Sequence, residues 1–314
     1  MQSTAPRGGH PFGMALLAAL LVLPGPAAVW AAPQETAPAA GEAYAVSARV
    51  HATLAAAFAA EPLSSAWPRL PDDTLNSEGA FDAAIQAAVA DNNLTRCLHL
   101  CIRALLDLPV SASFPGRWSR ALAFAEGRER AFGATAPDTT ADVLASVADA
   151  WPHGEDAYWS GQVIVVGRAA RRGEGLGVLH RLRALVADPR MPERFRPDFE
   201  GQLGTALEGT KDYQGALESY AQLERSAPAV PSSAGALLHA VFINLDLGRT
   251  PEAMRIIRIL GTVPGAVLDK ANGAAQIREF VGLLNAGAVP DFWTRSRVWW
   301  SQWQALPFAS SAEG

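Results

Sequence analysis

The sequence has little of what marks an enzyme or a disulfide-stabilised domain. Two cysteines in 314 residues allow one disulfide at most, which excludes a disulfide framework. A serine nucleophile elbow, a His-Glu-x-x-His pair, a phosphate-binding loop and a haem-attachment motif are all missing. The segment from Trp151 to Asp156 places His153 beside two acids, but we interpret it as a polar turn before a helix. We therefore expect no enzymatic activity, no cofactor and no metal.

A strong excess of charge is also missing. The chain carries 26 basic and 31 acidic residues, which gives a net charge of −5 at pH 7. This mild acidity argues against nucleic acid as a partner. Arginines do gather between Arg168 and Arg196, and the first of them are Arg168, Arg171 and Arg172. This basic patch is either a solvated helical face or a docking surface for an anionic partner.

The apolar run near the N-terminus is too short to span a membrane. It extends from Met14 to Leu23, about 10 residues, whereas a spanning helix needs roughly 20. The break Pro24-Gly25-Pro26 follows, and Val29-Trp30-Ala31 fits the small-residue pattern of a signal-peptidase site. We predict a signal peptide at residues 1–31, a disordered lead-in at 32–42, and export to the periplasm or the extracellular space.

A helical-hairpin signature lies in the second half of the chain. A Leu-Gly pair in the first helix is followed by an aromatic residue after the turn, then a small residue, a second aromatic residue and a closing proline. Small residues let the two helices approach closely, and bulky residues fill the space between neighbouring hairpins. In this chain these positions are Leu203, Gly204, Tyr213, Ala216, Tyr220 and Pro228.

This order of residues resembles the tetratricopeptide repeat. The chain departs from the family pattern at Glu200, where a large aromatic residue is usual, at Lys211, which replaces the turn glycine, and at Leu223, which replaces a small residue. A second unit repeats the register, with Gly248 in its turn and Ala253 as its small residue. The resemblance therefore does not rest on a single unit.

The same register extends toward the N-terminus. The residues Val178, Ala216 and Ala253 are 38 and 37 residues apart, whereas the usual repeat has roughly 34. Further upstream, the turn Asp91-Asn92-Asn93 precedes Cys97. The resemblance implies an all-α, right-handed solenoid of about five antiparallel hairpins with capping helices at both ends. The expected boundaries are 43–75 for the N-terminal capping helix and loop, 76–265 for the repeats, 266–306 for the C-terminal capping helices and 307–314 for the tail.

The resemblance also implies where a ligand binds. In tetratricopeptide-repeat proteins the first helices of the hairpins line a concave surface that recognises a protein or peptide. The expected function is therefore that of an exported, non-catalytic scaffold for a protein or peptide partner. On its concave surface we place Gln202, Thr205, Glu208, His239, Phe242 and Asp246.

The two cysteines lie four residues apart, on one face of an expected helix. Thiolates bind soft metals, so Cys97 and Cys101 together suggest a metal site. However, His99 between them points to another side of the helix, and the repeat register puts both cysteines at packing positions. We favour buried structural thiols, since a disulfide within one helix would strain the backbone.

Four tryptophans gather near the C-terminus, at Trp293, Trp299, Trp300 and Trp303. They either cap the last apolar face of the solenoid or form an exposed aromatic surface. The exposed surface would support an alternative function, in which this helix holds the protein to a membrane or to another part of the cell envelope. A third function, an envelope enzyme on a helical scaffold, would need a catalytic acid on an additional domain.

Overall fold

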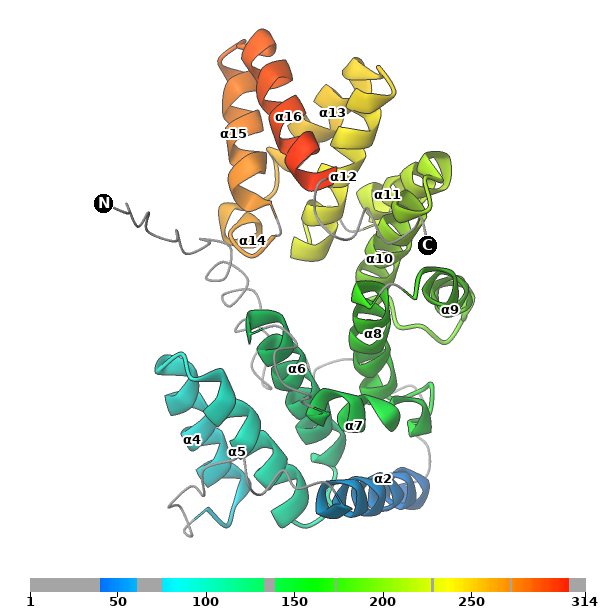
Figure 1. Ribbon diagram of the computed structural model, residues 1–314, viewed down its shortest axis with the longest axis vertical. Coiled ribbons are helices and arrows are strands. Elements are labelled where there is room, and N and C mark those ends of the chain that lie inside the picture. Colours follow the sequence, from blue (N-terminus) through cyan, green and yellow to red (C-terminus); the bar gives the residue numbers. More distant parts are fainter. Residues whose placement is uncertain are drawn as a thin grey trace, which may run out of the picture. The chain divides into compact units, whose positions relative to one another are not determined.

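The protein is helical throughout its described part. The computed structural model describes residues 40–60, 75–132, 139–172, 174–226, 229–271 and 273–304 (Figure 1). These residues form fourteen α-helices and one short 3-10 helix, and no strand occurs among them, which confirms the expected all-α class. The predicted signal peptide, the C-terminal tail and Pro228 lie outside the described residues. The first described helix begins at Ala40, within the predicted lead-in.

The chain divides into two compact units, with the boundary after Val147. The described helices of the first unit are α2 (Ala40–Ala60), α4 (Glu78–Ala90), α5 (Leu94–Asp107), α6 (Phe114–Phe132) and α7 (Thr140–Ser146). Helix α5 contacts α2, α4 and α6, and α7 contacts α2 and α6. Nε1 of the buried Trp118 donates a hydrogen bond to the backbone oxygen of Leu144, 3.0 Å away, which joins α6 to α7.

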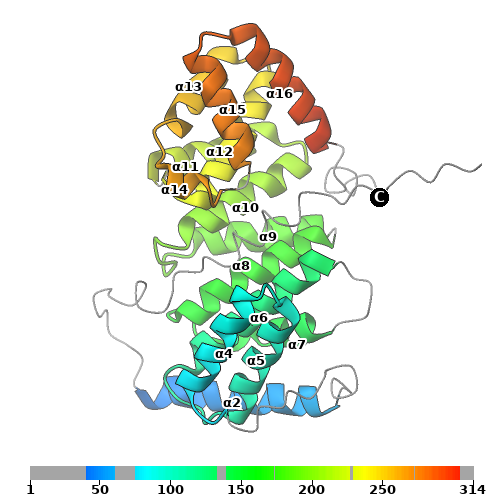
Figure 2. The same cartoon turned by 90° about the vertical axis from the view of Figure 1, so that its left-hand side faces the viewer.

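The second unit begins at Ala148 and is built from paired helices. Its described elements are η1 (Ala148–Ala150), α8 (Asp156–Arg171), α9 (Gly175–Ala187), α10 (Arg196–Gly209), α11 (Tyr213–Ser226), α12 (Pro231–Asp246), α13 (Thr250–Leu260), α14 (Gly265–Leu268), α15 (Ala274–Asn285) and α16 (Val289–Gln304). Consecutive helices contact each other as pairs, α8 with α9, α10 with α11, α12 with α13 and α15 with α16 (Figure 2). Helix α12 also contacts α10, α11 and α14.

One turn geometry recurs between the helices of a pair. A backbone N–H donates to the carbonyl oxygen five residues earlier, and the residue before that N–H has a left-handed φ, as in a Schellman motif. The left-handed residues are Asn92, Lys211, Gly248 and Gly287, with φ of 55°, 62°, 70° and 70°. The hydrogen bonds run from the N–H groups of Asn93, Asp212, Arg249 and Ala288 to the oxygens of Ala88, Leu207, Asn244 and Leu283, at 2.9, 2.9, 2.7 and 2.9 Å.

The position five residues after each of these four turn residues is buried. The residues there are Cys97, Ala216, Ala253 and Phe292, and each is 0% exposed. The turn fixes where the second helix begins and how it is rotated, so the same helical position faces the interior each time. Among the other residues with a predicted packing role, Leu203, Gly204 and Tyr220 are buried, Tyr213 is half-buried, and Gly248 is exposed in its turn.

Gly204 allows α10 and α11 to approach closely. A Cβ atom at this position would lie less than 3.0 Å from three atoms of the Tyr220 ring. The Tyr220 side chain is fully buried, so its ring has no free space to move into.

We expect Gly204→Ala to lower the free energy of unfolding by about 1–3 kcal/mol, because the added methyl group overpacks the contact with Tyr220. The matched control is Gly209→Ala at the end of the same helix, where a Cβ meets no atom within 4 Å. The control is expected to change stability by less than about 0.5 kcal/mol. Urea unfolding followed by circular dichroism measures both variants, and equal midpoints would contradict the close contact.

Lys211 occupies a backbone conformation that favours glycine. A side chain at φ of 62° is strained, so Lys211→Gly is expected to stabilise the hairpin by about 1 kcal/mol relative to Lys211→Ala. Both variants remove the lysine side chain, and only Lys211→Gly relieves the backbone strain.

Conversely, Gly248→Ala is expected to destabilise its hairpin although a Cβ there has open space. Thermal unfolding is the measurement, and identical melting temperatures for the two Lys211 variants would disprove the strain.

Candidate functional site

The residues predicted to line a concave surface differ widely in exposure. They lie on α10 and α12, the first helices of two hairpins. Thr205 and Asp246 are exposed, Gln202 and Glu208 are half-buried, and His239 and Phe242 are buried. Only part of this set therefore offers a side chain to a ligand.

Glu208 and His239 belong to a polar network that joins three helices. The Glu208 carboxylate accepts a hydrogen bond from the Tyr220 hydroxyl at 3.2 Å, and the same oxygen lies 2.8 Å from Nδ1 of His239. Burial and the neighbouring Glu208 raise the pKa of Tyr220 well above its ordinary value. The hydroxyl therefore stays protonated and keeps donating. These contacts link α10, α11 and α12 and give both predicted ligand-binding side chains a packing role.

Phe242 is covered by the C-terminal hairpin. Its ring stacks on Trp300 with a centroid distance of 5.5 Å and meets Phe280 edge-on at 6.0 Å. Phe292 of α16 is fully buried and packs against the same Phe280 ring. Helix α16 thus covers apolar side chains of α12 and α15, as a terminal cap does.

The other tryptophans of α16 are only partly covered. Trp293 and Trp299 are half-buried, and Nε1 of Trp299 donates a hydrogen bond to Glu279 at 3.2 Å. Val298 beside them is 44% exposed. The side chain of Trp303 lies outside the described part of the chain. The helix therefore has one packed face and one face open to solvent.

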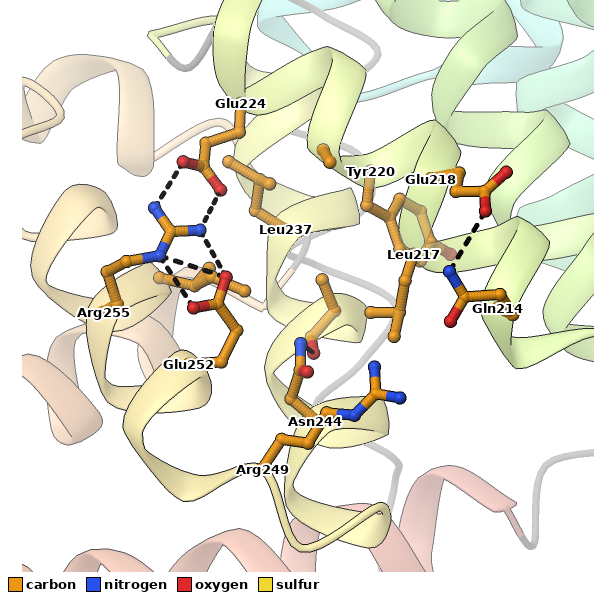
Figure 3. A pocket seen from close by; sticks show the side chains of 13 residues that line it. Gln214, Leu217, Glu218, Tyr220, Glu224, Leu237, Asn244, Arg249, Glu252 and Arg255 are labelled. Carbon is orange, nitrogen blue, oxygen red and sulfur yellow. Dashed lines mark hydrogen bonds and ion pairs between the residues drawn. The ribbon is translucent and has the colours of Figure 1, made fainter.

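An open groove lies between α11, α12 and α13 (Figure 3). Its volume is about 320 Å³. Apolar side chains line its floor, among them Leu217, Leu237, Ala240 and Ile256. Leu237 and Ile256 are buried, whereas Leu217 remains half-exposed. The groove therefore offers apolar surface framed by the polar side chains of two neighbouring hairpins.

A closed cluster of three charges forms one side of the groove. The Arg255 guanidinium on α13 donates to both carboxylate oxygens of Glu224 on α11 and to both oxygens of Glu252, at 2.5 to 3.0 Å. The Glu224 and Glu252 carboxylates raise the pKa of Arg255, and Arg255 lowers the pKa of Glu252. The cluster bridges the second helices of two hairpins.

Arg249 stands apart from this cluster. Its side chain is exposed and makes no hydrogen bond or ion pair with the described residues. Figure 3 shows it beside Asn244, separated from Arg255 and Glu224 by the groove floor. Gln214 and Glu218 occupy the facing part of α11, where the Gln214 amide donates to the Glu218 carboxylate at 3.0 Å.

Sequence reasoning did not identify this groove. The family resemblance predicts a ligand-binding surface on the first helices of the hairpins. Two of the three helices that form the groove are instead second helices. One signal was present in the sequence, because Glu252 and Arg255 are three residues apart and therefore share a face of α13.

Four of the eight arginines of the predicted basic patch form ion pairs with acids. Arg168 is buried, Arg171 is half-buried and Arg172 is exposed. Burial, together with the nearby Arg172, lowers the pKa of Arg171 to about 10. Farther along the stretch, Arg181, Arg190, Arg194 and Arg196 form ion pairs with Asp149, Asp188, Asp156 and Glu193, respectively.

His153 is fixed in the turn that precedes α8. Its Nδ1 lies 3.0 Å from the Asp188 carboxylate, and its ring stacks on Tyr158 with a centroid distance of 4.0 Å. Nε1 of Trp159 donates to the backbone oxygen of His153 at 2.7 Å. Hydrogen bonds from Arg190 are the main cause of a lowered pKa for Asp188. The turn is thereby tied to the end of α9.

The two cysteines are buried inside α5. Cys97 and Cys101 are both free thiols. Burial raises the pKa of Cys97 to about 11 and also raises the pKa of Cys101. Since the thiolate is the reactive and metal-binding form, we expect both side chains to react slowly in the folded protein.

We expect a thiol reagent such as DTNB to react slowly with the native protein at about pH 8 and rapidly in denaturant. A Gln222→Cys variant supplies the control, because this position on α11 is exposed. The added thiol is expected to react in the native state while the other two do not. Native labelling of three thiols at one common rate would contradict the burial of Cys97 and Cys101.

The chain matches no protein-family model, and no curated protein or solved structure is significantly similar to it. None of the described helices is long and apolar enough to cross a bilayer. Among the same residues, no group of three or more His, Cys, Asp or Glu side chains is arranged to hold a metal ion. The groove between α11, α12 and α13 combines apolar surface with the exposed side chain of Arg249.

Proposed function

We propose that the protein is an exported, non-catalytic scaffold of helical hairpins that binds a protein or peptide segment. The hairpins would form a right-handed solenoid resembling those of tetratricopeptide-repeat proteins. The recurring left-handed turn supports this proposal, as does the buried residue five positions after it. A further support is the packing of α10–α11 and α12–α13 as two successive pairs in contact. The predicted signal peptide supports a location in the periplasm or outside the cell.

The groove between α11, α12 and α13 is the observation that carries the binding function. A bound segment gains affinity from apolar surface and gains orientation from a few polar groups around it. Leu217 and Ala221 supply the exposed apolar surface above the buried Leu237 and Ile256, and Arg249 and Glu218 supply charge at its edge.

We place the principal binding site in this groove rather than on the predicted concave surface. The side chains of His239 and Phe242 already pack against other parts of the second unit, so binding a ligand there would require breaking native contacts. Thr205 and Asp246 remain exposed on the same helices and are available for additional contacts.

Contact with a membrane or another envelope surface is the second candidate function. The exposed Val298 and the half-buried Trp293 on α16 favour it. However, α16 also covers Phe242 and Phe280, so removing the helix would uncover core side chains. Substitution of Val298 by a charged residue is therefore a cleaner test of this contact than deletion of the helix.

We expect the purified protein to select peptides from a displayed library of random sequences, and Ala221→Arg to abolish the selection. Ala221 lines the groove, so a long charged side chain there would fill it. The control is Gln222→Arg, which adds the same charge at an adjacent exposed position of α11. Fluorescence polarisation with the enriched peptides measures binding by each variant, and circular dichroism checks that both variants keep their helices.

Two results would overturn the proposed function. One is a library from which the folded protein enriches no peptide. The other is an Ala221→Arg variant that is folded and still binds the selected peptides as tightly as Gln222→Arg does.

A further inference from the structure

The charged side chains around the groove differ in whether they are ion-paired. Arg255 donates hydrogen bonds to Glu224 and Glu252, and each of these carboxylates accepts through both of its oxygens. Each of the three already makes charge-assisted hydrogen bonds to an opposite charge, so a charged ligand group would compete with these bonds. On this side of the groove, the cluster of Glu224, Arg255 and Glu252 therefore links α11 to α13 and has a structural role.

Arg249 is a charged side chain of the groove that can pair with a ligand. Its backbone is fixed, because its N–H donates to the oxygen of Asn244 at 2.7 Å within the recurring turn. Its side chain is exposed along the groove and has no partner among the described residues. The guanidinium thus presents planar N–H donors, an arrangement that matches a carboxylate.

The surroundings of Arg249 favour a singly charged anion. Glu218 also lines the groove, and its negative charge would repel a doubly charged phosphate more strongly than a carboxylate. Gln214 donates one hydrogen bond to Glu218, whereas the Arg249 guanidinium has no partner among the described residues, so all of its donors can meet an acidic group.

We infer that the groove recognises a peptide segment in which an acidic side chain accompanies an apolar one. The acidic carboxylate binds Arg249, and the apolar side chain packs on the partly exposed Leu217 and Ala221, above the buried Leu237 and Ile256. This inference rests on the proposed function, because it names the chemistry of the segment that the same groove would bind. The apolar contact supplies affinity for many sequences, and Arg249 selects among them.

The test is a parallel selection from the random peptide library with the wild-type protein, Arg249→Glu and Arg258→Glu. Arg258 lies exposed on α13 and does not line the groove, so its reversal makes the same change in net charge. We expect the wild type and Arg258→Glu to enrich peptides with an acidic residue at a fixed distance from an apolar one. Arg249→Glu is expected to bind these peptides about tenfold more weakly or worse, and to enrich basic residues instead.

Added salt gives a second readout. An ion pair with the exposed Arg249 is screened, so we expect binding of the acidic peptides by the wild type to weaken as salt rises, and binding by Arg249→Glu to change less. The inference would be overturned if the enriched peptides showed no preference for acidic residues, or if Arg249→Glu selected the same peptides as the wild type. Either result would leave the proposed binding of peptides in the groove intact. Loss of binding in Arg258→Glu equal to that in Arg249→Glu would also overturn it. Failure of every protein to enrich peptides would instead overturn the proposed function.

Discussion

The hydrogen bond that closes the turn in four of the described hairpins sets the packing of the second helix. An N–H that reaches back five residues requires a left-handed residue in the turn, and the next helix then begins at a fixed point with a fixed rotation. This constraint explains why residues as different as Cys97, Ala216, Ala253 and Phe292 share one buried position. The size of the residue varies with the neighbouring helix, whereas its orientation does not.

The sequence predicted the helical class and the packing positions of the clearest hairpins. Ala216 and Tyr220 are buried as their spacing indicated, because both follow directly from helix periodicity. Lys211 was recognised as a departure from the family pattern, yet the turn keeps its left-handed backbone. A local motif of this kind depends on a few neighbouring residues, and it is therefore readable from the sequence.

The candidate site was much less predictable. Whether a side chain on α12 is exposed depends on what packs over it from elsewhere in the chain, and Phe242 is covered by Trp300, which lies 58 positions later. The groove likewise requires side chains of three helices to converge, and Glu224 meets Arg255 across 31 residues. Such contacts leave no periodic signal in the sequence. Only the local pair of Glu252 and Arg255 was visible in advance.

Helix α12 is the place where much of the second unit converges. Twelve of its 16 residues are buried, and it contacts α10, α11, α13 and α14, while its Phe242 touches Trp300 of α16. In an ideal linear array each hairpin touches only its neighbours, so the ends can fray one at a time. Here, unfolding of α16 would expose Phe242 of α12, which lies in the middle of the unit's sequence. We therefore expect the second unit to unfold as one cooperative block, and not to lose its C-terminal helices first.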